Sequence, residues 1–115
     1  MNRWRVIIDT DPGVDDAAAI LLALASPEIE LLGISVVAGN VGLEASVRNA
    51  CKLVAVARRP DVPVYAGAAR PLVRDQVFGK YANVGAFSDA LVPATDVRPR
   101  QLSAVQFIAD KAREA

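Results

Sequence analysis

The sequence predicts an α/β fold built on an open parallel sheet. Strand-like apolar runs alternate with helix-like segments in the order β-α-β-α-β-loop-α, which is typical of parallel strands joined by right-handed crossovers. The second strand-like run is continuously apolar, as expected for a strand that helices cover on both faces. We expect one domain, because 115 residues suffice for one hydrophobic core but not for two.

The first half of the chain predicts two strand-helix pairs. Residues 4–9, WRVIID, are mostly apolar and β-branched, which indicates a buried strand. Residues 15–26 are rich in alanine and leucine and end before Pro27, which is typical of a helix. Residues 29–39 form the continuously apolar strand, and residues 42–59 predict the second helix.

The second half predicts one strand, a long irregular segment and one helix. Residues 62–68 read VPVYAGA and indicate the third strand. Residues 68–98 are longer than the usual connection of about 4 to 6 residues, which predicts a functional or poorly ordered loop. Residues 99–114 predict a helix with apolar residues along one side, namely Leu102, Val105, Ile108 and Ala112. Because no strand follows this helix and three strands make a small sheet, we expect a truncated domain.

The composition narrows the class of protein. Thirteen basic and thirteen acidic residues give a formal net charge of zero, so we expect neither nucleic acid nor an anionic membrane as a partner. No apolar run reaches the roughly 18 residues of a membrane span, and no signal-peptide pattern begins the sequence. Cys51 is the single cysteine, which excludes a disulfide framework and favours a reducing cytoplasm. Since the chain has no histidine to activate it, we expect a buried, unreactive thiol.

Four acidic residues surround the end of the first predicted strand with no Lys or Arg among them, namely Asp9, Asp11, Asp15 and Asp16. Two carboxylates about 4 Å apart repel each other by roughly 4 kcal/mol at an effective dielectric constant of 20. The dipole of the following helix offsets only about 0.3 to 1 kcal/mol per acid. A trapped proton or a bound cation would relieve the repulsion. Because the available ligands are oxygens, a hard ion such as Ca²⁺ or Mg²⁺ is favoured.

The turn between the first strand and the first helix carries further signals. We expect Pro12 and Gly13 to fix this turn, with a positive φ at Gly13. Taken singly, Asp15 and Asp16 are also explained as acids that stabilise the amino end of a helix. Asn40 follows the second strand and so lies at the same sheet edge, where ligands bind in such sheets; it is either a turn residue or a ligand contact.

Three segments resemble a known family: DTDPGVDDAAAILLAL at 9–24, ELLGISVVAGN at 30–40 and VRNACKLV at 47–54. They are similar to the amino-terminal part of the inosine-uridine nucleoside hydrolases, the Ca²⁺-dependent N-ribohydrolases. The resemblance implies a Rossmann-like nucleoside hydrolase fold, with residues 1–115 as the amino-terminal portion of a single domain. It also implies purine or pyrimidine salvage by a homo-oligomer, in which a Ca²⁺-bound water cleaves a ribonucleoside between ribose and nucleobase.

The resemblance assigns a role to each matching residue. It makes Asp11 a Ca²⁺ ligand and the general base for water, and Asp16 a bidentate Ca²⁺ ligand. Asp9 would support the metal site from close by. Asp15 would hold ribose hydroxyls, and Asn40 would contact the ribose as well.

The sequence also departs from the family pattern. Members often carry His-Gly in the loop after the third strand, whereas this chain has VFGKYANVGAF at 77–87. Phe78, Lys80 or Tyr81 would line the base pocket instead, or serve only for packing. The family domain is more than twice as long as this chain, so its later metal ligands and leaving-group residues would lie beyond residue 115.

Two alternative functions stay open at this point. VIIDTDPG at 6–13 also resembles the strand-end motif of haloacid-dehalogenase-like phosphotransferases, in which Asp9 would be the nucleophile, Asp11 the acid/base and Mg²⁺ the metal. Pro12, Gly13 and the two further acids depart from that motif. The second alternative is an inactive truncated remnant that binds a metal or assembles with other chains.

Overall fold

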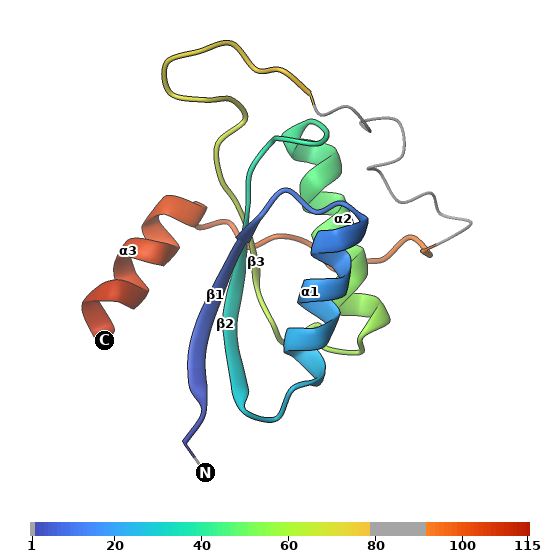
Figure 1. Ribbon diagram of the computed structural model, residues 1–115, viewed down its shortest axis with the longest axis vertical. Coiled ribbons are helices and arrows are strands. Elements are labelled where there is room, and N and C mark those ends of the chain that lie inside the picture. Colours follow the sequence, from blue (N-terminus) through green and yellow to red (C-terminus); the bar gives the residue numbers. More distant parts are fainter. Residues whose placement is uncertain (1, 79–91) are drawn as a thin grey trace.

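The computed structural model describes residues 2–78 and 92–115, which form an α/β structure around a parallel sheet (Figure 1). The sheet has the order β1-β2-β3, and its strands are β1 (Trp4–Thr10), β2 (Ile29–Val36) and β3 (Val64–Ala66). The helices of the described residues are α1 (Val14–Ala25), α2 (Leu43–Val56) and α3 (Ala104–Glu114). The predicted fold class and the order of its elements are therefore confirmed.

The strand register brings the carboxyl ends of the strands to one edge of the sheet. Thr10 pairs with Val36, and Val36 pairs with Ala66, in parallel register. The pairing of β1 with β2 is irregular only between Val6 and Ile7. The segments that leave β1 and β2 therefore start side by side, as the sequence predicted for the candidate site.

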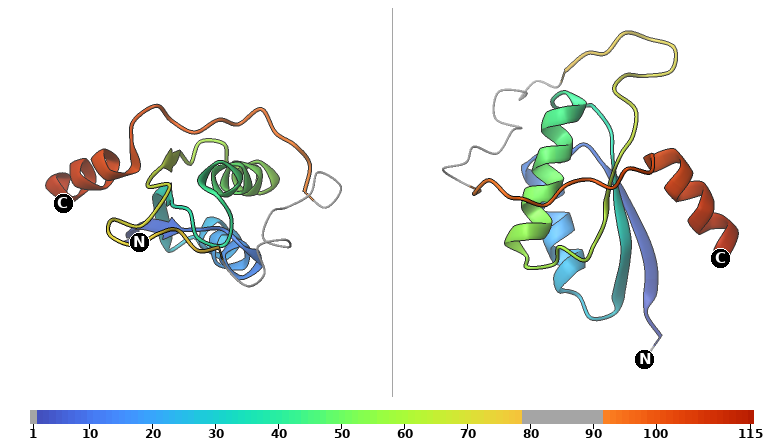
Figure 2. Two further views of the ribbon diagram at one scale, coloured as in Figure 1. Left: turned by 90° about the horizontal axis from the view of Figure 1, so that it is seen from above. Right: turned by 180° about the vertical axis from the view of Figure 1, so that it is seen from behind.

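The hydrophobic core lies between the sheet and the pair α1 and α2, which cover the same face (Figures 1 and 2). The side chains at its centre are fully buried, or nearly so, and come from both layers: Ile20, Ile34, Val36, Val54 and Val64. Alternating β2 residues supply the sheet side of this core, since side chains of a strand alternate between its faces. This packing fixes where α1 begins, and so fixes the turn that precedes it.

Helix α3 covers the opposite face of the sheet (Figure 2). The ring of Phe107 stacks on the ring of Tyr65, with centroids 4.0 Å apart and planes 13° from parallel. Gly33 makes room for this ring, because a Cβ there would lie 2.6 Å from Cζ of Phe107. The predicted apolar side of the helix is exposed at all four of its residues, namely Leu102, Val105, Ile108 and Ala112. The buried residues of α3 are Ala104 and Phe107, which the sequence did not single out.

The last helix also begins later than predicted. The backbone N–H of Arg100 donates to the carbonyl of Val64 at 2.7 Å, and Arg100 forms a parallel bridge with Tyr65. This pairing holds the chain extended beside β3. The helix starts only after Ser103, whose hydroxyl accepts from the N–H of Gln106 at 3.2 Å and so caps its first turn.

The connection between β3 and α3 carries neither helix nor strand in its described parts, residues 67–78 and 92–103, apart from the bridge at Arg100. This agrees with the predicted irregular segment. Phe78 is exposed, whereas Lys80 and Tyr81 lie outside the described residues. No helix among the described residues is long and apolar enough to cross a membrane.

Candidate active site

The candidate site is the turn that joins β1 to α1, at the carboxyl edge of the sheet. We call residues Asp11–Gly13 the DPG loop. Pro12 and Gly13 are buried and Asp11 is half-buried, so the loop is packed into the protein and not displayed on its surface. Its neighbours are the segment after β2 and the amino-terminal half of α2.

Asp11 is held by the turn that follows β2. Its Oδ2 accepts the backbone N–H of Asn40 at 2.9 Å, and its backbone carbonyl accepts Nδ2 of Asn40 at 3.1 Å. Gly39 lies so close that a Cβ there would overlap the carboxylate, with 2.8 Å to Cγ of Asp11. The predicted meeting of Asp11 and Asn40 at one sheet edge is therefore present, and it is made by direct hydrogen bonds.

Gly13 serves a different purpose from the one the sequence suggested. Its φ is −108°, so the expected positive φ was wrong. A Cβ at Gly13 would lie 2.9 Å from Nδ2 of Asn40, which is closer than side chains normally approach. The glycine is needed here because the side chain of Asn40 passes directly over the backbone.

The two acids of α1 lie in its first turn. Oδ2 of Asp16 accepts the backbone N–H of Gly13 at 3.1 Å, which satisfies one of the N–H groups left unpaired at a helix start. Asp15 is exposed. Both acids also face the positive end of the helix dipole. The structural role that the sequence offered for Asp16 is thus present, and it leaves the second carboxylate oxygen for another partner.

Asp9 has a partner of its own on the neighbouring strand. The hydroxyl of Ser35 donates to Oδ1 of Asp9 at 2.5 Å, and the two residues are register neighbours in the sheet. Ser35 is fully buried. This bond fixes the Asp9 carboxylate at the end of the strand, immediately before the DPG loop.

Asn49 is a residue of the site that the sequence analysis missed. It is buried in α2, and its Nδ2 donates to the carbonyl of Pro12 at 3.1 Å. The sequence carries only a weak signal for it: Asn49 follows Arg48 and precedes Ala50 and Cys51 in the segment VRNACKLV. A buried amide in such a setting needs a hydrogen-bond partner, and here the partner is the DPG loop.

The carboxylate oxygens of the candidate site are the kind of ligand that a hard cation prefers, but the described residues supply too few of them. Among residues 2–78 and 92–115, no three His, Cys, Asp or Glu side chains form a group that could hold a metal ion. The carboxylates of Asp11 and Asp16 offer the oxygen ligands that Ca²⁺ prefers, but Ca²⁺ takes about six to eight of them. The described residues therefore supply part of a coordination shell at most.

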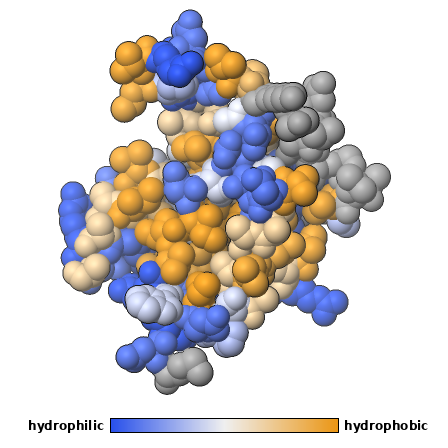
Figure 3. All heavy atoms as spheres, in the orientation of Figure 1, coloured by the Kyte–Doolittle hydropathy of each residue, from blue (hydrophilic) through white to orange (hydrophobic). Residues whose placement is uncertain are grey.

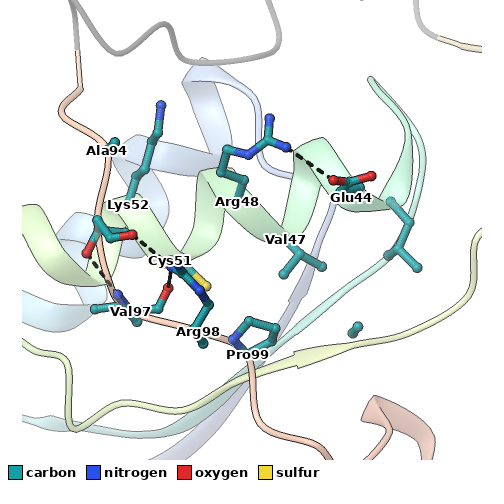
Figure 4. Close-up of a pocket in the computed structure, with 12 residues that line it drawn as sticks. Glu44, Val47, Arg48, Cys51, Lys52, Ala94, Val97, Arg98 and Pro99 are labelled. Carbon is teal, nitrogen blue, oxygen red and sulfur yellow. Dashed lines mark hydrogen bonds and ion pairs between the residues drawn. The ribbon is translucent and has the colours of Figure 1, made fainter.

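A separate cavity of about 690 Å³ lies between α2 and residues 94–99 (Figure 4). Charged side chains line part of it, namely Glu44, Arg48, Lys52 and Arg98. Cys51 also reaches its wall and is buried, as predicted. Burial raises the pKa of the Cys51 thiol, an effect that the positive charge of Arg98 partly offsets. None of the predicted site residues belongs to the described lining.

The sequence of this chain is similar to those of known proteins. A model of the family "Inosine-uridine preferring nucleoside hydrolase" matches residues 6–115. An uncharacterized protein of Schizosaccharomyces pombe is 46% identical over 110 residues, which cover 95% of this chain and 36% of that protein. Uridine nucleosidase 1 of Arabidopsis thaliana is 40% identical over 116 residues, which cover 96% of this chain and 33% of that protein.

Solved structures give the same result. The purine-preferring ribonucleoside hydrolase from Gardnerella vaginalis superposes with a TM-score of 0.86 at 34% identity, covering 96% of this chain and 37% of that one. The chain therefore spans about a third of the length of the relatives that it matches. The family match extends over nearly the whole chain and includes the DPG loop, Asn40 and Asn49. The chain belongs to the inosine-uridine preferring nucleoside hydrolase family.

Proposed function

We propose that this chain contributes the DPG-loop part of an enzyme that hydrolyses the N-glycosidic bond of ribonucleosides to nucleobase and ribose, in nucleoside salvage. Family membership supports the reaction class. The observation that carries the proposal is the carboxylate of Asp11, which the backbone of Asn40 fixes at the carboxyl edge of the sheet. Ligands of open parallel sheets bind at this edge.

In this proposal Asp11 is the general base that removes a proton from the attacking water, and it is also a metal ligand. Asp16 is a second ligand, and Asp9, held by Ser35, supports the metal site. Ca²⁺, when bound, would lower the pKa of water and so ease its deprotonation. The nearby negative charges would then stabilise the positive charge that develops on the sugar as the glycosidic bond breaks.

Asp15 and Asn40 are the proposed ribose contacts. Asp15 is exposed in the first turn of α1, where its carboxylate can accept hydrogen bonds from sugar hydroxyls. The Nδ2 of Asn40 already donates to Asp11, so the amide oxygen is the atom that would accept from a ribose hydroxyl. Both side chains lie beside Gly13, since a Cβ there would be 2.9 Å from Nδ2 of Asn40 and 3.6 Å from Oδ1 of Asp15, and a sugar bound to both would lie next to the DPG loop.

We also propose a reducing, cytoplasmic setting. The single cysteine of the chain is buried in the core, and an even set of paired cysteines would be expected of a small secreted domain.

The reaction is tested by a reducing-sugar assay on inosine and uridine, with Ca²⁺ and with a chelator. Ribose release should need Ca²⁺, and Asp11→Ala should lower the rate by about 10² to 10⁴ from loss of the base alone. Asp16→Ala should mainly weaken Ca²⁺ binding, so excess Ca²⁺ should restore part of the rate. Asp61→Ala is the matched control, because Asp61 is exposed and pairs with Arg59 just before β3, at the opposite sheet edge.

A parallel assay for phosphate release from a phosphomonoester with Mg²⁺ covers the other reaction class. Phosphate without ribose would contradict the hydrolase function and would move the nucleophile to Asp9. Ribose release that survives Asp11→Ala would overturn the assignment of the base. If the 115-residue chain releases neither product, the chain by itself is inactive, and the assay is repeated in a longer chain that carries the rest of the family domain.

A further inference from the structure

We propose that Asn49 is a positioning residue for the DPG loop, which it holds through the carbonyl of Pro12 from the buried side of α2. The effect of Asn49 on metal binding rests on the proposed function, whereas its effect on the position of the loop rests on geometry alone. Among the described residues, Asn49 is a buried amide that reaches this loop from helix α2 and not from the turn at the sheet edge.

Three successive residues of the DPG loop are each held by one side chain from a different segment. Nδ2 of Asn40 donates to the carbonyl of Asp11 at 3.1 Å. Nδ2 of Asn49 donates to the carbonyl of Pro12, and Oδ2 of Asp16 accepts the N–H of Gly13, each also at 3.1 Å. The segments are the turn after β2, helix α2 and helix α1. The loop is thus fixed at every residue.

The bond from Asn49 is the one that holds the middle of the loop. Proline has no backbone N–H, so the backbone of Pro12 can be held only through its carbonyl. Pro12 is fully buried and Asn49 is 1% exposed, which leaves little access for water to replace the amide. A buried polar group without a partner costs about 1 to 3 kcal/mol, so this bond favours a single position for the loop.

The position of Pro12 determines the position of Asp11. The carboxylate of Asp11 lies directly against Gly39 and accepts the N–H of Asn40, so it has little room to move independently. If the peptide group that contains the carbonyl of Pro12 shifts, the neighbouring Asp11 shifts with it, and its carboxylate moves away from the N–H of Asn40. Displacement of a catalytic group by about 1 Å can lower a rate on the order of 10²-fold.

The test compares Asn49→Leu with Val54→Ala in the 115-residue chain. Leucine keeps the approximate bulk of asparagine but cannot donate to Pro12. Val54 is fully buried in the same helix, and Val54→Ala weakens the core without touching the loop. NMR measures amide hydrogen exchange at Gly13 and Asn40, whose N–H groups donate to the two carboxylates, together with Ca²⁺ affinity.

At equal global stability, adjusted with urea, Asn49→Leu should speed exchange at Gly13 and Asn40 at least about tenfold relative to Val54→Ala, because the loop opens locally. The dissociation constant for Ca²⁺ should rise by about 10- to 100-fold, the usual effect of losing a group that orients a ligand. If Asn49→Leu does not fold, Asn49→Ala replaces it, with the same expected changes.

Equal exchange at Gly13 and Asn40 in the two variants would overturn the inference. Faster exchange with no change in Ca²⁺ affinity would overturn its link to the metal site. A wild-type chain that binds no Ca²⁺ would instead contradict the proposed metal role of Asp11 and Asp16, while the exchange rates would still decide whether Asn49 positions the loop.

Discussion

Two glycines set the geometry of the candidate site, because each lies in close contact with a side chain of the site and has no room for a Cβ. Gly39 abuts the carboxylate of Asp11, and Gly13 abuts the side chain of Asn40. The sequence placed Asp11 and Asn40 at one sheet edge, because strand ends can be recognised from local pattern. It could not show why the two glycines are needed, since the groups they abut are 28 and 27 residues away in the chain and meet them only in the folded protein.

We predict that Gly39→Ala displaces the carboxylate of Asp11 and weakens Ca²⁺ binding by about 10- to 100-fold, with the chain still folded. Gly42→Ala is the matched control, because a Cβ at Gly42 has no atom within 4 Å. Calorimetric Ca²⁺ titration and thermal unfolding by circular dichroism measure the two effects. Similar Ca²⁺ affinities in the two variants would show that the contact with Gly39 does not position Asp11.

The thiol of Cys51 should make the free energy of unfolding depend on pH in the alkaline range. Burial raises its pKa in the folded state, so the unfolded chain loses the thiol proton first as the pH rises. Stability is therefore fully present below the unfolded thiol pKa of about 8.5 and falls as the pH rises above it. Urea unfolding at pH 7 and pH 10 should show a larger loss for the wild type than for Cys51→Ala, and equal losses would contradict this origin.

Elements were predictable where local signals define them and not where distant residues do. The bounds of β1, β2 and α1 lie close to those predicted, because apolar runs, Pro27 and the acids of the first turn are adjacent in sequence. The predicted start of helix α3 was wrong, and its buried residue Phe107 was not predicted. Arg100 pairs with β3 instead of entering the helix, and Phe107 is selected as the anchor because Gly33 leaves space for its ring.

The end of α2 carries a strained residue that a substitution can relieve. Arg58 has a φ of 59°, and the N–H groups of Arg58 and Arg59 donate to the carbonyls of Ala55 and Val54, as in a Schellman motif. A left-handed conformation costs a non-glycine residue about 1 to 2 kcal/mol. Glycine removes that cost, but its greater freedom in the unfolded chain cancels part of the gain.

We predict that Arg58→Gly raises the free energy of unfolding by about 0.5 to 1 kcal/mol, measured by urea denaturation. Arg58→Ala serves as the control, because alanine keeps the left-handed strain and should give no such gain. A gain of the same size in both variants would point to loss of the arginine charge as the cause.

The molecule as a whole presents apolar surface around an open sheet edge. Among the described residues β1 pairs only with β2, so its other edge is without a strand partner there. Apolar side chains gather over the middle of the face that displays β1 and α1 (Figure 3). Exposed apolar residues lie on β1 and on helices at both faces of the sheet, namely Trp4 on β1, Leu22 on α1, and Val105 and Ile108 on α3. Such an edge is a site for pairing with another chain.

We therefore predict that the isolated 115-residue chain self-associates, seen as concentration-dependent sedimentation. Trp4→Lys should reduce the association, because an exposed lysine on an edge strand opposes pairing. Leu72→Lys is the control, since Leu72 is fully exposed but lies in the irregular segment after β3. A monomer at all concentrations would contradict the prediction.

In the proposed function, Asp11 of the DPG loop and Asp16 of α1 are the metal ligands of a nucleoside hydrolase, and Asp11 is its general base. A crystal structure of the chain grown with millimolar Ca²⁺ tests it most directly, with Asp11→Ala crystals as the control. We expect an ion about 2.3 to 2.6 Å from carboxylate oxygens of Asp11 and Asp16, which the Asp11→Ala crystals lack. A DPG loop without an ion, or an ion bound only elsewhere, such as in the cavity beside α2, would contradict the claim.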